Sequence, residues 1–319
     1  MRAVVCTRYG SPDVLELRAL EKPTPRPYEV RIRVRATAVT SSDCIVRGFN
    51  LPASMWIPAR LALGIAKPRK SVLGMVLAGD IDAPGNAVTS FRGGEQVFAF
   101  DRFGFGAYAD YKCMRAGGVL AAMPSNLNYA EAAAIPYGGM LALHFLRRGG
   151  IRRGQRVLVY GASGAVGTAA VQLAKHFGAE VTGICSTSNL GLVRSLGADA
   201  VIDYTKDDFT TMGERYDLIF VAVGNRVKPP LRAACANALG TDGAYVSVDR
   251  GRPKLLPGDL LLLKQLVEAE DLKPVIDRCY SLEQIAEAHR YVDAGHKKGN
   301  VVITLAPSAA QPRSITAKC

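Results

Sequence analysis

The 319-residue chain has few cysteines and few aromatic residues, and it has no long apolar run. Its seven cysteines are an odd number and none are spaced C-x-x-C, so neither a disulfide framework nor a structural zinc lobe is indicated. The longest apolar stretches fall well short of the ~18 residues that span a bilayer. The first residues are strand-like and lack the features of a signal peptide. We therefore expect a soluble, cytoplasmic protein.

Acidic residues are also scarce, since 28 Asp and Glu stand against 40 Lys and Arg and leave a formal net charge of +12. This excess favours an anionic partner, which could be nucleic acid, a membrane surface or a phosphorylated cofactor. Hydrophobic residues make up 49% of the chain, as in an ordinary globular protein, and the length corresponds to about two domains.

The first 110 or so residues consist of short alternating runs broken by Gly, Pro and Asp, which predicts a mostly β region. In the clearest run, Val30, Ile32 and Val34 alternate with arginines at 31, 33 and 35. The arginine row could bind nucleic acid, but the solvated face of a strand explains it more simply.

From about residue 129 the pattern changes to strands separated by helices, which predicts a doubly wound parallel sheet. The predicted strands are 156–160, 180–185, 200–202, 218–223 and 245–248, and the predicted helices are 166–177, 189–196 and 229–239. Beyond residue 260 we expect a helix, a strand near residue 275, a helix over 282–294, a strand over 300–305 and a frayed tail.

A glycine-rich turn, Gly161-Ala-Ser163-Gly164-Ala165-Val166-Gly167, joins the predicted strand 156–160 to the next helix. Glycines let the backbone approach a pyrophosphate, and the N–H groups and dipole of a helix N-terminus favour its negative charge. In this context the turn predicts dinucleotide binding, against the alternative of a bland tight turn.

The end of the second strand of this region bears on the identity of the dinucleotide. NAD sites usually carry Asp or Glu there, for the ribose 2′-hydroxyl. Here the strand 180–185 runs into Ser186-Thr187-Ser188-Asn189, which suits a 2′-phosphate and favours NADP over NAD. The alternative is that these polar residues only cap the following helix.

These patterns, taken with motifs along most of the chain, resemble the medium-chain dehydrogenase/reductase superfamily, and specifically its zinc-independent, zeta-crystallin-like quinone oxidoreductase branch. Besides the glycine-rich turn, the motifs are Ser42-Asp43 with Arg47-Gly48, Gly94-Glu-Gln-Val-Phe-Ala, Gly106-Ala-Tyr-Ala-Asp-Tyr, Leu196-Gly-Ala-Asp, Val201-Ile-Asp-Tyr204 and Gly295-His-Lys-Lys-Gly-Asn300.

The resemblance implies an α/β protein in which a GroES-like catalytic β domain is built from both chain ends, over 1–124 and 262–306. A Rossmann domain that binds NADP(H), a doubly wound parallel sheet over 125–261, is inserted between them, and 307–319 is a flexible tail. Cofactor and substrate would meet in the cleft between the two domains.

The residues expected to bind the cofactor lie in the glycine-rich turn, at the strand ends and after the last glycine. They are Gly161, Ser163, Gly164, Ala165, Val166, Gly167, Ser186, Thr187, Asn189, Tyr204, Val223, Gly224, Val248, Asp249 and Asn300. Relatives often carry Lys at the position of Asn300.

No metal is expected. Thr40 stands where zinc-dependent relatives carry a ligand Cys, and Met75 stands where they carry a ligand His. The stretch 101–106 lacks the four cysteines of a structural zinc site, so neither kind of site has its ligands.

The resemblance therefore implies an NADPH-dependent reductase that transfers hydride to a small hydrophobic quinone or α,β-unsaturated carbonyl compound. Thr40, Asp43, Arg47 and Tyr137 are the candidates for substrate contact; Asp43 and Arg47 could instead form a structural i, i+4 ion pair. One alternative is an enoyl-thioester reductase. Another is a non-catalytic protein whose binding to nucleic acid or protein is regulated by NADPH.

Two segments depart from the family pattern. The long apolar and basic segment 49–70 could be a substrate flap or contact a membrane that holds a lipid quinone, although a packed helix and loop is favoured. The stretch 249–261 is short and lacks the strand that commonly builds the family's dimer. Whether the protein forms a homodimer is therefore left open. Nucleic acid is disfavoured as a partner, because a solvated strand face explains the arginine row.

Overall fold

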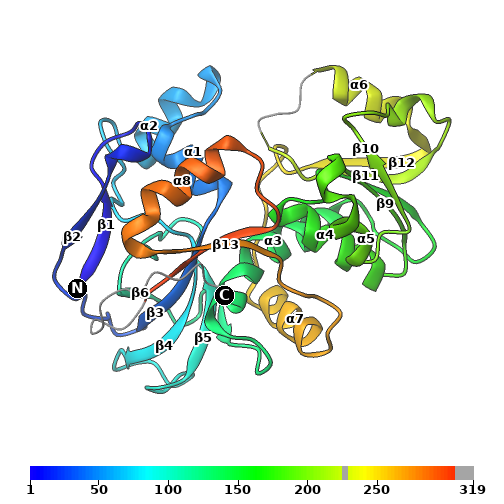
Figure 1. Ribbon diagram of the computed structural model, residues 1–319. Helices are drawn as coiled ribbons and strands as arrows, with labels where there is room; N and C mark the ends of the chain where they lie inside the picture. The colour runs from blue at the N-terminus through cyan, green and yellow to red at the C-terminus, as the bar shows by residue number, and fades with distance from the viewer. Residues whose placement is uncertain (225–228, 306–319) are drawn as a thin grey trace. The chain divides into compact units, whose positions relative to one another are not determined.

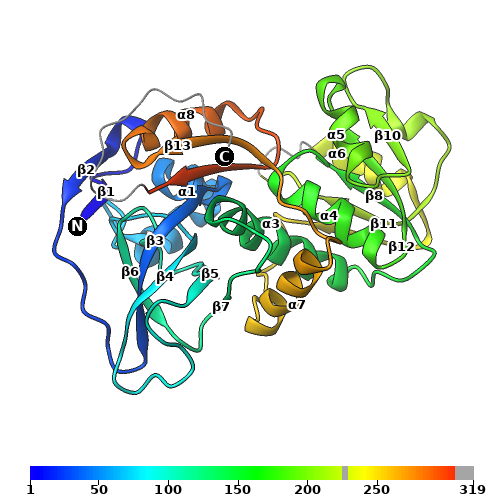
Figure 2. The same cartoon turned by 60° about the horizontal axis from the view of Figure 1, so that its bottom comes forward.

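The computed structural model describes residues 1–224 and 229–305, and the chain forms two compact units. The first unit combines Met1–Pro136 with the described residues from Ile276 onward, and the second is Tyr137–Val275. Figures 1 and 2 both show α8, near the end of the chain, beside α1 near its beginning, and β13 joins the same sheet as β3 through the strand β14 between them. One domain built from both chain ends is thus present.

The first unit is mostly antiparallel β structure. Its strands are β1 (Arg2–Cys6), β2 (Leu15–Ala19), β3 (Glu29–Val39), β4 (Val76–Pro84), β5 (Gln96–Phe100), β6 (Tyr111–Arg115), β7 (Leu120–Ala122), β13 (Ile276–Ser281) and β14 (Asn300–Thr304). β1 and β2 pair with each other; the other strands form a sheet of order β13-β14-β3-β4-β5-β7, with β6 also on β3. Its helices are α1 (Ser41–Gly48), α2 (Trp56–Leu63) and α8 (Ile285–Ala294), and α8 packs on α1.

The arginine row on β3 lies on the face of the strand opposite to its buried side chains. Val30, Ile32 and Val34 are buried, whereas Arg31 pairs with Asp82 and Arg35 pairs with Asp80. The prediction of a strand with one polar face is confirmed, and two of its three cations have acidic partners inside the protein.

The second unit is a doubly wound parallel sheet, as predicted. Its strands are β8 (Arg156–Tyr160), β9 (Glu180–Cys185), β10 (Ala200–Asp203), β11 (Tyr216–Val221) and β12 (Leu239–Ser247); its helices are α4 (Ala165–His176), α5 (Leu190–Ser195), α6 (Pro229–Asn237) and α7 (Pro257–Glu268). All four strand pairs are parallel, and the strand order is β10-β9-β8-β11-β12. α3 (Tyr129–Arg148) crosses the boundary between the two units.

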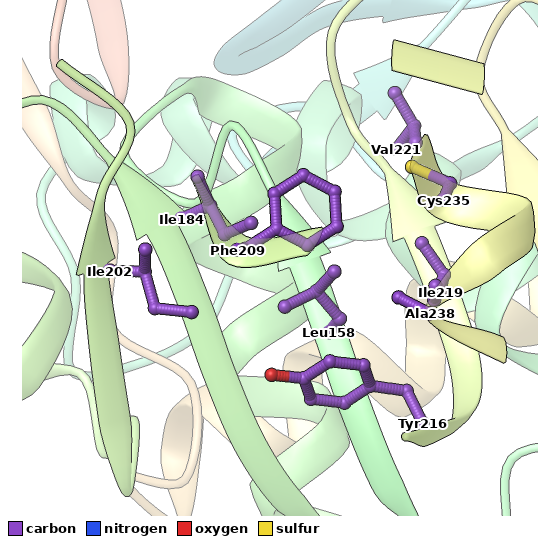
Figure 3. Close-up of a cluster of buried hydrophobic side chains, with 9 residues drawn as sticks. All are labelled: Leu158, Ile184, Ile202, Phe209, Tyr216, Ile219, Val221, Cys235 and Ala238. Carbon is purple, nitrogen blue, oxygen red and sulfur yellow. The ribbon is translucent and has the colours of Figure 1, made fainter. Parts of the chain in front are cut away.

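The sheet is covered by apolar side chains. Val157, Leu158 and Val159 on β8 are fully buried, which is why this central strand reads as a continuous apolar run. Figure 3 shows Leu158 at the centre of a cluster in which Ile184, Ile202, Phe209 and Ile219 approach from neighbouring elements. This packing fixes the strand ends that carry the candidate site.

The boundaries of the two units differ from the domain ranges expected from the sequence. Residues 262–275 pack with the second unit, because Leu263 of α7 lies against Gly139 and Gln172 of α4 hydrogen-bonds the backbone at Lys273. Residues 125–136 belong with the first unit, where the Tyr129 hydroxyl donates to Asp80.

The sheet ends at β12, and residues 248–256 form turns and coil before α7 begins. The absence of a further strand from this stretch, inferred from its length, is therefore confirmed. No helix within the described part of the chain is long and apolar enough to cross a membrane.

Candidate functional site

The candidate site lies at the carboxyl edge of the parallel sheet, where the strand order reverses. Successive strands run outward from β8 to β9 and β10, and the chain then returns to place β11 and β12 on the other side of β8. In open α/β sheets, ligands bind outside the carboxyl ends of the strands at such a switch point. Here the loops after β8 and β11 meet there.

The three glycines of the turn after β8 differ in what surrounds them. Gly161 has a φ of +78°, and a Cβ on it would lie 2.4 Å from the Val223 side chain. A Cβ on Gly167 would lie 2.1 Å from the Gly161 carbonyl oxygen, so this glycine lets α4 pack against the turn. A Cβ on Gly164 would come no closer than 3.6 Å to the Gly161 carbonyl oxygen, so nothing in the protein requires glycine at this position. A ligand that closely approaches the backbone at Gly164 would require it.

The N-terminus of α4 provides donors for that ligand. Gly164 is the N-cap residue, and no side chain caps the helix. The backbone N–H groups of Ala165, Val166 and Gly167 belong to the first turn, where an α-helix offers no intrahelical acceptors. With the positive end of the helix dipole, they form an anion site of the kind that pyrophosphate occupies.

The predicted residues after β11 and β12 border the same turn. Val223 lies against Gly161, and a Cβ on Gly224 would come within 3.0 Å of the Asp249 carboxylate. The Val248 N–H donates to the carbonyl of Val221, which ties the end of β12 to the end of β11. The structure therefore brings together residues that are up to 88 positions apart in the sequence.

Ser163, Ser186 and Asn189 form a polar cluster beside the turn, at the end of β9. The Asn189 side-chain amide donates to the Ser163 hydroxyl and to the Ser186 hydroxyl, both at 3.1 Å. Each serine oxygen thus accepts from Asn189, and the Ser186 hydroxyl also lies 3.5 Å from the Ser188 hydroxyl. Asn189 is buried, and its Oδ1 has no hydrogen-bond partner among the described residues. Asn189 therefore orients two hydroxyls rather than capping α5, because its side chain makes no cap hydrogen bond.

The Thr187 hydroxyl, expected from the sequence to contact the cofactor, donates its proton to a side chain of the protein. The acceptor is the buried Asp203 carboxylate, which also accepts from the Thr205 hydroxyl at 2.6 Å. Hydrogen bonds from Thr187 and Thr205 hold the pKa of Asp203 below its ordinary value. Sequence analysis missed Asp203; its signal was the strand register, since β10 pairs with β9 and places Asp203 opposite Cys185.

Tyr204 follows Asp203 directly and is about half exposed. Its ring centroid lies 6.3 Å from that of Tyr160, at the end of β8. The tyrosine is therefore at the predicted edge, with part of its ring available to a ligand.

Thr40 and Asp43 of the first unit serve to begin a helix. The Thr40 hydroxyl accepts from the Asp43 backbone N–H and donates to the Asp43 carboxylate at 2.6 Å, while the Thr40 N–H donates to the same carboxylate. This capping box starts α1, and the Gly74 N–H donates to the other carboxylate oxygen at 3.1 Å. Burial raises the pKa of Asp43 to about 6, although the hydrogen bonds from Thr40 and Gly74 act in the opposite direction.

Arg47 forms its ion pair with Asp293 and not with Asp43, so the i, i+4 pair considered from the sequence is wrong. Arg47 Nη2 lies 2.7 Å from the Asp293 carboxylate of α8, and the Arg47 side chain is buried. Cys44 on the same helix lies 3.3 Å from His289 Nδ1, also on α8. α1 and α8 are thus joined through buried polar contacts, which sequence analysis missed because their partners are more than 240 positions apart.

Two predicted residues lie outside these clusters. Tyr137 is a buried residue of α3 directly after Pro136, at the start of the second unit. Asn300 is buried at the beginning of β14 and so belongs to the first unit, whereas the other predicted cofactor residues belong to the second.

Family models match most of the chain. Residues 26–125 match the alcohol dehydrogenase GroES-like domain, and residues 165–266 and 256–303 match two models of zinc-binding dehydrogenases. The chain is 32% identical to 2-methylene-furan-3-one reductase of Solanum lycopersicum and 32% identical to the chloroplastic NADPH-dependent alkenal/one oxidoreductase of Arabidopsis thaliana; each match covers 95% of this chain and 79% of the relative. It is 28% identical to a quinone oxidoreductase of Pseudomonas aeruginosa, over 92% of this chain and 97% of the relative.

A solved structure of an NAD-dependent alcohol dehydrogenase superposes with a TM-score of 0.83 at 28% identity, over 96% of this chain and all of that chain. The chain belongs to the medium-chain dehydrogenase/reductase superfamily. The first unit is therefore the superfamily's GroES-like domain and the second its Rossmann-type domain, which confirms the predicted fold class.

The superfamily's nicotinamide cofactor fits the residues present. Gly164 leaves space at the N-terminus of α4, the first-turn N–H groups face that space without a capping side chain, and Ser163 and Ser186 hold hydroxyl donors nearby. NAD(P)H is the cofactor that this arrangement accommodates.

The superfamily also includes zinc enzymes, so the positions of possible ligands matter. No group of three or more His, Cys, Asp or Glu side chains within residues 1–224 and 229–305 could hold a metal ion. At the two positions where zinc-dependent relatives carry ligands, the Thr40 hydroxyl donates to the Asp43 carboxylate and accepts from the Asp43 N–H, and Met75 is buried.

Proposed function

We propose that this protein is an NADPH-dependent, zinc-independent reductase that transfers hydride to a quinone or an α,β-unsaturated carbonyl compound. The observation that carries the proposal is the glycine-lined helix N-terminus at the switch point of the sheet, in a chain related over 95% of its length to reductases named for such carbonyl compounds. A relative named as a quinone oxidoreductase supports the second acceptor class.

In the proposed mechanism, the N–H groups of Ala165, Val166 and Gly167 would hold the pyrophosphate, and Gly164 would allow its approach. Val223, Gly224, Val248 and Asp249 line the continuation of the same edge. When bound there, NADPH would supply the hydride for the acceptor, and solvent would supply the proton that completes the reduction. The residues of the chain therefore bind and orient, and none needs to transfer a proton.

The preference for NADPH is proposed from the Ser163–Asn189–Ser186 cluster. The Ser163 and Ser186 hydroxyls accept from Asn189, and hydroxyls held in this way can donate to the acceptor oxygens of a 2′-phosphate. The carboxylate of Asp203 is one strand further out and is engaged by Thr187 and Thr205. A free carboxylate at the end of β9, which would favour the ribose 2′-hydroxyl of NAD, is lacking in the sequence 186–189.

Zinc independence is proposed from the residue types at the two ligand positions. Neither a threonine nor a methionine is among the usual zinc ligands, which are thiolate, imidazole and carboxylate. A conjugated acceptor suits such a site, because its own conjugation stabilises the charge that forms on hydride addition. We further propose a cytoplasmic location and a small hydrophobic substrate. Any homodimer would lack the additional strand that commonly builds the family's dimer, since residues 248–256 form turns and coil.

The test is a substrate panel with the loss of NADPH as the readout. Quinones, enones and crotonyl thioesters are offered to the purified chain, before and after treatment with a chelator. The proposal predicts turnover of quinones or enones that the chelator leaves unchanged. Turnover of thioesters alone would select the enoyl-thioester alternative; NADPH binding without turnover of any acceptor would select the non-catalytic one.

A further inference from the structure

Helix α2 and the residues on either side of it carry an unusual group of exposed apolar side chains. Met55, Trp56, Ile57, Leu61 and Ile65 are each more than half exposed, and Ile57 and Ile65 reach 76% and 72%. The other exposed large apolar side chains of the described residues are spread along the rest of the chain. Single exposed apolar residues are common on soluble proteins, whereas a contiguous set marks a contact surface.

These side chains stand on a helix that is fixed to the first unit. The Arg60 guanidinium lies over the ring of Phe49 at 4.1 Å and over that of Tyr9 at 4.7 Å. The Tyr9 hydroxyl donates to the Gly64 carbonyl at 2.9 Å, and Ala59 is buried. Ile57 and Leu61 are one helical turn apart on the opposite, exposed side of α2. The exposed apolar face is therefore held in place by its inner face.

The charge around this face has one sign. Lys67, Arg69 and Lys70 are exposed and follow Ile65 within five residues. No Asp or Glu occurs between residues 44 and 79. A partner surface with a negatively charged outer layer and an apolar interior would complement both the three cations and the exposed apolar side chains.

We propose that this surface, which we define as Met55, Trp56, Ile57, Leu61, Ile65, Lys67, Arg69 and Lys70, docks the protein peripherally on an anionic lipid membrane. Trp56 and the aliphatic side chains would enter the interface between headgroups and acyl chains, and the three cations would contact anionic headgroups. Such docking would not require a spanning helix. If the proposed function holds, it would place the enzyme where apolar acceptors accumulate.

A second copy of the chain is a poorer occupant of this surface. A symmetric dimer brings the same patch of both copies together, so the two sets of three cations would face each other without an acidic residue between them. An anionic membrane has no such conflict, and its attraction for the cations adds to burial of the apolar side chains.

The experiment is co-sedimentation of the full chain with vesicles of phosphatidylcholine, with or without phosphatidylserine, at low and high salt. Two variants test the two halves of the surface: Ile57→Ser with Leu61→Ser, and Lys67→Ser with Arg69→Ser and Lys70→Ser. The matched control is Tyr28→Ser with Phe103→Ser, because each of these side chains is 73% exposed elsewhere on the first unit. NADPH binding by each variant confirms that it is folded, and it does not depend on the vesicles.

We expect binding to the anionic vesicles that weakens with salt and falls on the order of tenfold in either test variant, while the control binds normally. No sedimentation at low salt would overturn the proposal, and so would equal binding to neutral vesicles or an equal loss in the control. Self-association in analytical ultracentrifugation that the Ile57→Ser, Leu61→Ser variant abolishes, without vesicle binding, would assign the surface to a second copy instead.

Discussion

The polar groups of Thr40 and Asp43, at the start of α1, have hydrogen-bond partners within the protein, whereas those at the carboxyl edge of β8 keep unused donors. At the start of α1, Thr40 and Asp43 use each other and the Gly74 N–H as partners. At the edge of β8, the first-turn N–H groups of α4 have no capping side chain, and Gly164 leaves space in front of them. Polar groups that the fold has already paired stabilise the protein, whereas those left with unused donors can bind a ligand.

This difference assigns separate consequences to mutations in the two regions. Changes in the α1 cluster should alter the free energy of unfolding and leave cofactor affinity intact. Changes at the edge of β8 that cause no clash within the protein should lower cofactor affinity and leave the free energy of unfolding nearly unchanged.

The largest effect is expected from Gly164→Val. Its branched side chain would fill the space in front of α4, and the affinity for NADPH should fall by about 100-fold, or roughly 3 kcal/mol. The free energy of unfolding should fall by no more than about 1 kcal/mol, because a Cβ at Gly164 meets nothing closer than 3.6 Å. Calorimetric titration and chemical denaturation measure the two quantities.

The matched control is Gly258→Val, since a Cβ on Gly258 of α7 meets nothing within 4 Å. It should leave NADPH affinity unchanged. If Gly164→Val bound NADPH as tightly as this control, the space at Gly164 would not be the cofactor's.

The second prediction concerns Asp43→Ala, which removes the carboxylate of the capping box. The Gly74 N–H and the Thr40 hydroxyl would lose a buried acceptor, and the free energy of unfolding should fall by about 2–3 kcal/mol. NADPH affinity should stay within about twofold, a change of under 1 kcal/mol. Asp13→Ala, at an exposed ion pair, should destabilise the protein much less. If Asp43→Ala lost NADPH binding without losing stability, the capping box of α1 would belong to the cofactor site and not only to the fold.

The pH dependence of stability provides a third test of the same carboxylate. Burial raises the pKa of Asp43 from 3.8 to about 6, so the folded state binds this proton more tightly than the unfolded state does. Its contribution to stability is present below pH 3.8 and is lost as the pH rises through 6. The unfolding free energy of the unmodified chain minus that of Asp43→Asn should therefore fall by about 2 kcal/mol between pH 4 and pH 7.

His289 also makes the free energy of unfolding depend on pH in this range. Because burial lowers its pKa to about 3, its contribution to stability rises with pH, opposite to that of Asp43. Its contribution is common to both proteins and cancels in the difference, provided that its contact with Cys44 is retained. A difference that is flat or that rises with pH would contradict the assignment of Asp43 as a buried acid.

A smaller effect is expected from Ser186→Asp, which places a carboxylate at the end of β9. Repulsion of the 2′-phosphate should weaken NADPH binding about tenfold, or 1.4 kcal/mol, while NADH binding holds or improves. Thr241→Asp adds the same charge at an exposed position of β12 and should change neither affinity. Equal losses for both cofactors would count against a 2′-phosphate subsite at Ser186.

Much of the fold is predictable because local patterns determine it. β8 and β9 have the bounds expected from the sequence, since a buried apolar run ends in each case at a glycine or polar turn. β12 begins at Leu239, six positions before the predicted start, because its pairing with β11 contains an irregularity between Tyr216 and Leu218 and includes Gly240 and Gly243. A strand with such residues looks like a turn until its partner is known.

Some features of the candidate site can likewise be predicted from local residues, and others cannot. The turn from Gly161 to Gly167 is predictable from its own residues, because the positive φ of Gly161 and the close approach of Gly167 to the Gly161 carbonyl are properties of the turn itself. The ion pair of Arg47 with Asp293 and the hydrogen bond of Thr187 with Asp203 depend on which helices and strands are neighbours. The sequence contains these residues but not their pairing, and that pairing decides which polar groups remain free for a ligand.

A calorimetric titration of the unmodified protein with NADPH and, separately, with NADH tests most directly whether the carboxyl edge of β8 is a cofactor site. One equivalent of NADPH should bind, and it should bind more tightly than NADH. Absence of binding by either nucleotide would contradict a cofactor site at the carboxyl edge of β8, and tighter binding of NADH would contradict the assignment of the Ser163–Asn189–Ser186 cluster.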